Sequence, residues 1–133
     1  IPGLDALFVA STYYASGCWL FDCAAKTRHE LTVTGSPACV STGFSQPVWV
    51  PELNAVAQWD NNAANAHRIT LYHPPANPKT SPWPITTLEF TIEDQPTGRC
   101  PRGTYGRFFY SRRLGGFGVV HATNQPIYFY ALR

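Results

Sequence analysis

Methionine, charged residues and long apolar runs are all scarce or absent in this chain of 133 residues. Charged residues make up 14% of the sequence, against roughly 25% in average soluble proteins. The formal net charge of +2 is too small to indicate nucleic acid or an anionic membrane by itself. No run approaches the ~18 apolar residues that a membrane-spanning helix needs, so we expect no membrane insertion. The hydrophobic content of 44% excludes an intrinsically disordered chain.

The lack of methionine extends to the first residue, which is Ile1. Because translation starts with methionine, this predicts that a secretory signal peptide has been removed. Four cysteines, an even number, agree with an oxidising destination. We therefore expect a secreted, extracellular protein that forms one domain over residues 1–133.

The cysteines are Cys18, Cys23, Cys39 and Cys100. We predict that they form two disulfides, and the sequence does not choose among the possible pairings. A zinc site is the competing interpretation, but zinc ligands usually come in closely spaced pairs, and Cys39 and Cys100 form no second pair. We expect no metal and no cofactor.

Short segments with alternating apolar and polar residues recur along the chain and predict about ten strands. They cover residues 6–14, 17–23, 30–34, 47–50, 54–60, 68–73, 85–93, 104–110, 117–122 and 126–132. Strands of this length, separated by turns rich in glycine and proline, are typical of an all-β antiparallel sandwich or flattened barrel. Helix signals are poor. Residues 22–30 could form two helical turns with Asp22 as N-cap, and residues 61–67 are predicted to be a loop.

One stretch, residues 73–84 (HPPANPKTSPWP), is rich in proline. Proline lacks an amide donor and fixes φ, so the stretch is predicted to be an exposed, rigid, polyproline-like loop. A rigid loop loses little entropy on binding, and we predict that it forms a recognition surface together with residues 61–67. A rigid connector is the competing interpretation. The predicted binding residues are His73, Pro74, Pro75, Asn77, Pro78, Lys79 and Trp83.

Two motifs within residues 87–120 resemble those of thaumatin-like proteins. The stretch Thr87-Leu88-Glu89-Phe90-Thr91-Ile92 is similar to the family's Thr-Leu-Ala-Glu-Phe-Ser/Thr-Leu strand. The stretch Thr97-Gly98-Arg99-Cys100, followed by Tyr105-Gly106-Arg107-Phe108-Phe109, resembles the family's Thr-Gly-basic-Cys and Tyr-Ser-x-Phe-Phe motifs. The resemblance implies an extracellular β-sandwich or flattened barrel without a cofactor. It also implies that Glu89 lies in a glucan-binding cleft, so Glu89 joins the predicted binding residues.

A second resemblance gives an enzymatic alternative. Fungal guanyl-specific ribonucleases use Glu as general base, Arg as phosphate ligand and His as general acid, and Glu89, Arg107 and His121 come in that order here. Tyr72 and His73 precede Glu89 as the family's Tyr and His do, and residues 119–123 (VVHAT) resemble its Val-Ile-Thr-His-Thr strand. Attack by a 2′-hydroxyl needs a base and an acid on opposite sides of the phosphate, together with a cation.

The arginines between residues 99 and 113 are interleaved with aromatic residues; they are Arg99, Arg102, Arg107, Arg112 and Arg113. This combination can bind nucleic acid, but a solvated face with arginines stacked on rings is the commoner arrangement, and we do not expect nucleic acid. Size and cysteine use resemble those of small secreted fungal elicitors and effectors that plants perceive. We favour a monomeric, non-enzymatic protein of this kind, which binds a plant host protein or a cell-wall carbohydrate.

Overall fold

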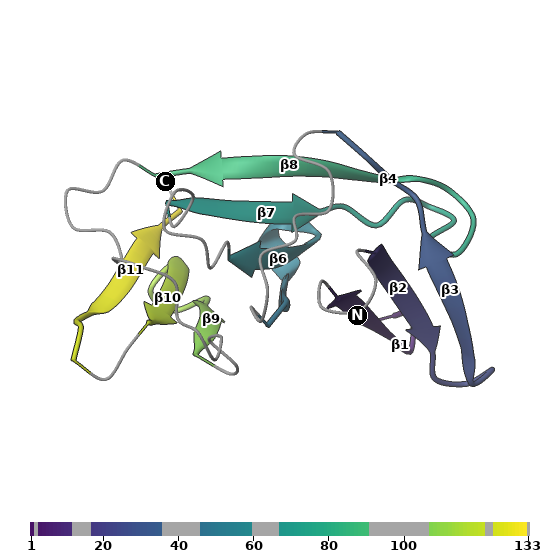
Figure 1. Cartoon of the computed structure of the whole chain (residues 1–133), viewed down its shortest axis with the longest axis horizontal. Coiled ribbons are helices and arrows are strands. Elements are labelled where there is room, and N and C mark those ends of the chain that lie inside the picture. Colours follow the sequence, from purple (N-terminus) through teal and green to yellow (C-terminus); the bar gives the residue numbers. More distant parts are fainter. Residues whose placement is uncertain are drawn as a thin grey trace.

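The computed structural model of the chain describes residues 1, 3–11, 17–35, 46–59, 67–90, 107–121 and 124–132. Over these ranges the protein is all-β, with eleven strands in three sheets and one short 3-10 helix, η1 (Pro51–Leu53). The prediction of an all-β protein is confirmed, and the arrangement is consistent with a β-sandwich. Figure 1 shows the two three-stranded sheets at opposite ends of strands β7 and β8.

The first sheet has the order β1-β2-β3 and is antiparallel throughout. Its strands are β1 (Ala6–Ser11), β2 (Gly17–Asp22) and β3 (Thr27–Leu31). Phe8 and Leu20 face each other across the β1–β2 pair and are buried, whereas their neighbours Leu7 and Phe21 are exposed. This alternation is what a sheet with one covered face requires.

The central sheet has the order β4-β8-β7-β6-β5. Its strands are β4 (Val33–Thr34), β5 (Val48–Val50), β6 (Ala55–Trp59), β7 (Arg68–Tyr72) and β8 (Trp83–Glu89), and only the β4–β8 pair is parallel. Pro51 ends β5 because proline cannot donate to the strand ladder. It starts η1, and Asn54 then takes a left-handed conformation (φ 43°) that returns the chain into β6.

The third sheet has the order β11-β10-β9 and is antiparallel. Its strands are β9 (Phe108–Ser111), β10 (Gly116–Val120) and β11 (Ile127–Ala131). Phe108 and Phe109 are neighbours in β9, so their side chains point to opposite faces of the sheet. Phe108 is 1% exposed and Phe109 is 40% exposed.

The central sheet is covered on both faces. Leu71 and Tyr72 are neighbours in β7, so their side chains point to opposite faces. Leu71 belongs to an apolar cluster with Phe117 of the third sheet. Tyr72 packs against Phe8 of the first sheet, with 4.9 Å between ring centroids. Because both faces are covered, all five residues of β6 are buried, polar Gln58 included.

The structure corrects the possible helix at residues 22–30. Residues 23–26 form a turn instead, and β3 begins at Thr27. Asp22 accepts a hydrogen bond from the amide of Ala25 at 2.8 Å, so it caps a turn in the way that it would cap a helix. Lys26 has a φ of 54°, which a right-handed helix excludes, and its conformation completes the reversal between β2 and β3.

The prediction that all four cysteines form two disulfides is wrong, because Cys23 is a free thiol. Cys18 is disulfide-bonded, while Cys39 and Cys100 lie outside the described residues. The position relative to β2 explains the difference between the two described cysteines. Cys18 points into the core and is 1% exposed, whereas Cys23 follows the end of the strand and its Sγ lies 3.9 Å from the carbonyl oxygen of Phe21.

Candidate binding surface at the proline segment

The proline-rich stretch connects β7 to β8, and a backbone hydrogen bond joins its two ends. The amide of His73 donates to the carbonyl of Pro84 at 2.9 Å. The last two residues of the predicted loop, Trp83 and Pro84, belong to β8. We call residues 73–82 the proline segment.

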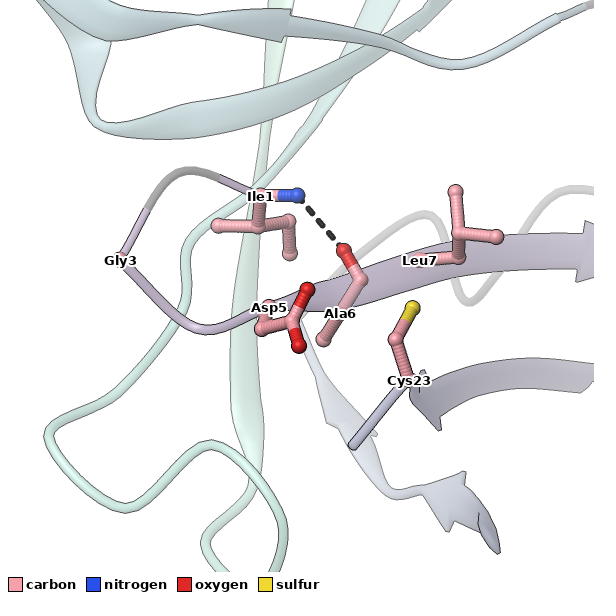
Figure 2. Close-up of a pocket in the computed structure, with 6 residues that line it drawn as sticks. All are labelled: Ile1, Gly3, Asp5, Ala6, Leu7 and Cys23. Atoms are coloured by element: carbon pink, nitrogen blue, oxygen red, sulfur yellow. Dashed lines mark hydrogen bonds between the residues drawn. The ribbon is translucent and has the colours of Figure 1, made fainter. Parts of the chain in front are cut away.

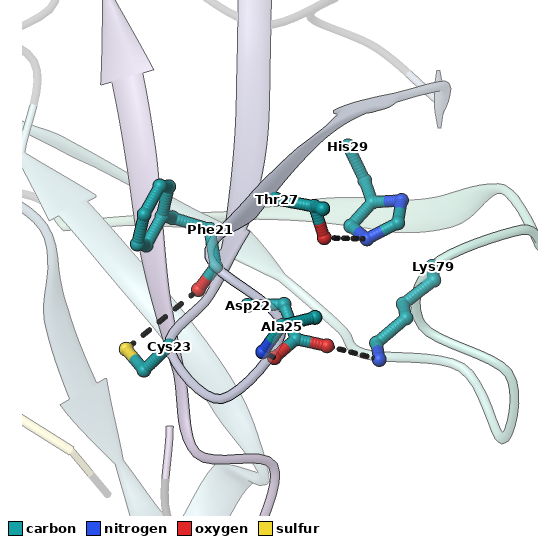
Figure 3. A network of polar contacts seen from close by, with 7 residues as sticks. All are labelled: Phe21, Asp22, Cys23, Ala25, Thr27, His29 and Lys79. Atoms are coloured by element: carbon teal, nitrogen blue, oxygen red, sulfur yellow. Dashed lines mark hydrogen bonds and ion pairs between the residues drawn. The ribbon is translucent and has the colours of Figure 1, made fainter.

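Four further contacts hold the proline segment in place. The indole N–H of Trp83 donates to the carbonyl of Pro78 at 2.8 Å. The carbonyl of Asn77 accepts from the amides of Thr80 at 3.2 Å and Ser81 at 2.9 Å. Lys79 forms an ion pair with Asp22 at the end of β2, and Figure 3 shows this pair beside the turn that Asp22 caps. These contacts favour the predicted rigidity of the segment.

The charge on Asp22 is maintained by its surroundings. The Ala25 amide and the Lys79 ammonium, with the amide as the larger cause, lower the pKa of Asp22 below its ordinary value of 3.8. The carboxylate is therefore ionised at neutral pH, and the ion pair ties the proline segment to the first sheet. Thr27 and His29, on the next strand, contact each other at 3.2 Å between Oγ1 and Nε2.

One face of the proline segment forms a pocket of ≈ 310 Å³. Its lining comes from four separate parts of the chain and comprises Ile1, Leu4, Trp49, Asn54, Pro74, Pro75 and Ala76. The Trp49 indole and the proline rings supply apolar walls, and the Asn54 amide supplies a donor and an acceptor. A volume near the lower end of ligand pockets and this mixed lining suit a small amphipathic group, such as a sugar ring.

The predicted binding residues are divided by the structure. Pro74 and Pro75 line the pocket, whereas Asn77, Pro78 and Lys79 hold the segment's shape through their hydrogen bonds and ion pair. His73 has its Nε2 2.9 Å from Oγ1 of Thr86. Trp83 is 0% exposed and packs against Phe8, so it offers no surface to a partner. Of residues 61–67, all but His67 lie outside the described residues.

Four pocket residues lie outside the predicted loop 73–84: Ile1, Leu4, Trp49 and Asn54. The sequence Pro-Glu-Leu-Asn at residues 51–54 is compatible with a short helical turn that ends on a left-handed Asn, and this signal could have located Asn54. No local pattern brings Ile1 and Leu4 to residues 74–76, because that contact depends on the fold.

Glu89 lies away from the pocket. It pairs with Arg68 at 3.0 Å, and the register places this pair at one end of the β7–β8 ladder and Tyr72 opposite Ile85 at the other. The two ends are four residue steps apart along β7, which is about 13 Å at ~3.3 Å per residue. The predicted set of Tyr72, His73 and Glu89 is therefore not brought together.

Two further groups of the ribonuclease alternative flank strands of the third sheet: Arg107 directly precedes β9, and His121 directly follows β10. His121 is 3% exposed and lies edge-on to Trp59 with 5.7 Å between ring centroids. Arg107 is half-buried, and its carbonyl accepts from the amide of Val120 at 2.8 Å. Tyr72 is buried and donates its phenol proton to Oε1 of Gln58 at 3.0 Å. Burial of His121 and Tyr72 leaves little of either ring for contact with an RNA substrate.

A second, open pocket of ≈ 650 Å³ lies where β1 begins. Figure 2 shows Ile1, Gly3, Asp5, Ala6, Leu7 and Cys23 around it, with the Ile1 amine donating to the carbonyl of Ala6 at 2.6 Å. In the part of the chain that the structure describes, no group of three or more His, Cys, Asp or Glu side chains could hold a metal ion. Nor does that part contain a helix long and apolar enough to cross a membrane.

No protein-family model, no curated protein and no solved structure matches this chain. The resemblances to thaumatin-like proteins, to guanyl-specific ribonucleases and to fungal elicitors therefore stay predictions from short motifs and from composition. In the second thaumatin-like motif, residues 97–100 and 105–106 also lie outside the described residues, whereas Arg107, Phe108 and Phe109 lie within them.

Proposed function

We propose that this chain is a secreted, non-enzymatic binding protein of the elicitor or effector type, which binds a plant host component through the proline segment. The observation that carries the proposal is the pocket in which Pro74 and Pro75 meet Trp49 and Asn54. A partner that occupies it meets walls that are already held in place, so little conformational entropy is lost on binding.

Of the two partner classes, a cell-wall carbohydrate suits the pocket better than a host protein. A pocket of ≈ 310 Å³ accepts one or two sugar rings. The apolar face of a sugar ring can lie on the Trp49 indole while its hydroxyl groups bond to the Asn54 amide. A protein–protein interface would instead need a much larger contact area, of about 800 Å² on each partner.

Binding is measured by isothermal titration calorimetry with hexasaccharides of β-1,3-glucan, cellulose, chitin and xylan. We expect at least one of them to bind. Replacement of residues 74–76 by Gly-Ser-Gly should abolish binding, since it removes the proline wall and leaves Asn77, Pro78 and Lys79 in place. Trp49→Ala should weaken binding by roughly thirtyfold, because an aromatic anchor at a binding site typically carries about 2 kcal/mol.

One control and one further test variant separate recognition from stability. Trp19→Ala removes a half-buried indole from the first sheet, away from the pocket, and should leave binding unchanged. Asn54→Gly keeps the left-handed backbone accessible but deletes the amide, so it should weaken binding without lowering the melting temperature much.

Leaf infiltration distinguishes the partner classes. If no hexasaccharide binds, but leaves produce an oxidative burst that the 74–76 replacement abolishes, the partner is a host protein. If wild type neither binds a glycan nor triggers a response, the proposal is overturned. RNA cleavage by the purified protein that is lost in Glu89→Gln would establish the enzymatic alternative in its place.

A further inference from the structure

The third sheet has an outward face that is distinct from the core. In β10 the side chains of Phe117 and Val119 point into the apolar cluster beneath the sheet and are fully buried. Because side chains alternate along a strand, Gly118 and Val120 point to the other side. This outward face contributes no residue to the proline-segment pocket, so a ligand on it is independent of the proposed function.

Large apolar side chains flank β10 on this outward face. The register places Phe109 of β9 and Phe129 of β11 on either side of Gly118, and places Ile127 opposite Val120. Their exposed fractions are 40% for Phe109, 45% for Phe129 and 66% for Ile127. Three neighbouring strands thus present a continuous apolar row to solvent.

The two phenylalanine rings lie over glycines of β10, Phe109 over Gly118 and Phe129 over Gly116. A Cβ added at Gly118 would lie 2.6 Å from Cε1 of Phe109, and a Cβ added at Gly116 would lie 2.7 Å from Cζ of Phe129. Each ring therefore occupies the space that a β10 side chain would fill, and aromatic side chains are known to cover strand glycines in this way.

The chain segment that forms this sheet contains basic residues but no acidic ones. All eight Asp and Glu residues of the chain precede residue 107, whereas residues 107–133 contain four arginines and no acidic residue. Arg113 is exposed in the turn between β9 and β10, beside Leu114, which is 64% exposed. Arg112 in the same turn pairs with Glu52 of η1.

We propose that the outward face of β9–β11 binds the surface of an anionic lipid bilayer. Protruding aliphatic and aromatic side chains enter the boundary between headgroups and acyl chains, and arginines beside them are attracted to anionic headgroups. A second copy of the chain fits less well, because it would bring together two sheets whose own strands and turns carry arginines and no acidic residue. A polynucleotide or acidic glycan would use the rings and arginines but leave Ile127 and Leu114 in water.

Vesicle co-sedimentation tests the proposal with phosphatidylcholine alone and with phosphatidylcholine containing one third phosphatidylserine. We expect binding only to the anionic vesicles, and we expect salt to weaken it. Arg113→Glu removes two units of positive charge and should weaken binding by about 25-fold, since each unit contributes roughly fivefold. Ile127→Ser should weaken it by about tenfold, because a mostly exposed side chain no longer enters the bilayer.

Matched substitutions on the first sheet serve as controls. Leu7→Ser removes a side chain that is 60% exposed, and Lys26→Glu reverses an exposed charge in the turn before β3. Both should leave vesicle binding unchanged. Equal losses in the control and test variants would show non-specific adsorption and overturn the proposal.

Three other results also overturn it: no binding to anionic vesicles, equal binding to neutral ones, or a concentration-dependent dimer whose formation Ile127→Ser abolishes. Poly(U) and polygalacturonate are run in parallel. Tighter binding to either polymer, lost in Arg113→Glu and retained in Ile127→Ser, would assign the face to a polyanion in solution.

Discussion

Ionisation of Tyr130 should make the protein unstable at alkaline pH. Tyr130 lies in β11, is 1% exposed, and packs against Phe90 with 5.1 Å between ring centroids. Burial raises the pKa of its phenol from 10.0 to about 12, although a hydrogen bond from the Trp59 side chain acts in the opposite direction. The folded state therefore favours the neutral phenol more strongly than the unfolded state does.

The sign of the effect follows from this difference. Below pH 10 the phenol is neutral in both states and its contribution to stability is fully present. As the pH rises from 10 to about 12, the unfolded chain ionises first and the contribution is lost. A pKa difference of this size corresponds to about 3 kcal/mol of the free energy of unfolding.

Urea unfolding between pH 8 and pH 12, followed by circular dichroism, measures the effect. With ~2 kcal/mol per molar urea for a small protein, the wild-type midpoint should fall by roughly 1–2 M over this range. Tyr130→Phe should be less stable at pH 8 by about 1 kcal/mol, because Trp59 loses a hydrogen-bond partner. The urea midpoint of the variant should fall less steeply with pH than that of wild type. The two curves of midpoint against pH should therefore cross. Parallel curves for wild type and variant from pH 10 to pH 12 would refute the argument.

Three further substitutions test the packing and polar contacts of the fold. Gly118→Ala places a methyl group against the Phe109 ring and should cost about 1–3 kcal/mol in thermal unfolding; the cost should shrink in a Phe109→Ala background, and an equal cost there would contradict the contact. Asp22→Asn removes the ion pair with Lys79. Since the pKa of Asp22 is lowered, its stabilisation is present above pH 3.8 and is lost as the pH falls through the folded pKa, so acid unfolding curves should converge for wild type and variant at low pH. Tyr72→Phe leaves buried Gln58 without one of its donors and should lower the free energy of unfolding by about 1–3 kcal/mol; a urea midpoint equal to that of wild type would show that the bond contributes nothing.

Strand positions could be predicted because alternation is a local property. The predicted segment 68–73 contains β7, and 17–23 contains β2, with boundaries within one residue. The prediction failed where a local signal had two structural meanings. Asp22 is a good cap for either a helix or a turn, and only the left-handed backbone of Lys26 decides between them.

The sequence pattern also did not show that the central sheet is covered on both sides. Gln58 and Thr70 alternate with apolar neighbours as exposed residues would, yet each is 4% exposed. Gln58 is tolerated inside because the Tyr72 phenol donates to it. The two partners lie fourteen residues apart in sequence, so no local pattern shows that they are paired. Considered alone, Gln58 is predicted to lie at the surface and Tyr72 to belong to a catalytic site.

The candidate site shows the same limit more sharply. The proline segment could be predicted as rigid, because proline restricts the backbone wherever it stands. Its role as a surface depends on which side chains face solvent. That is decided by Trp83, which lies in the core and holds Pro78 through its indole N–H. The position of Trp83 beside a proline-rich loop therefore predicted a contact with a partner. In the structure the Trp83 side chain instead stabilises the conformation of the loop. The aromatic wall comes instead from Trp49, whose strand pairs with β6 and is separated from β8 by two strands of the sheet. Recognition at this surface consequently depends on the order of strands in the central sheet.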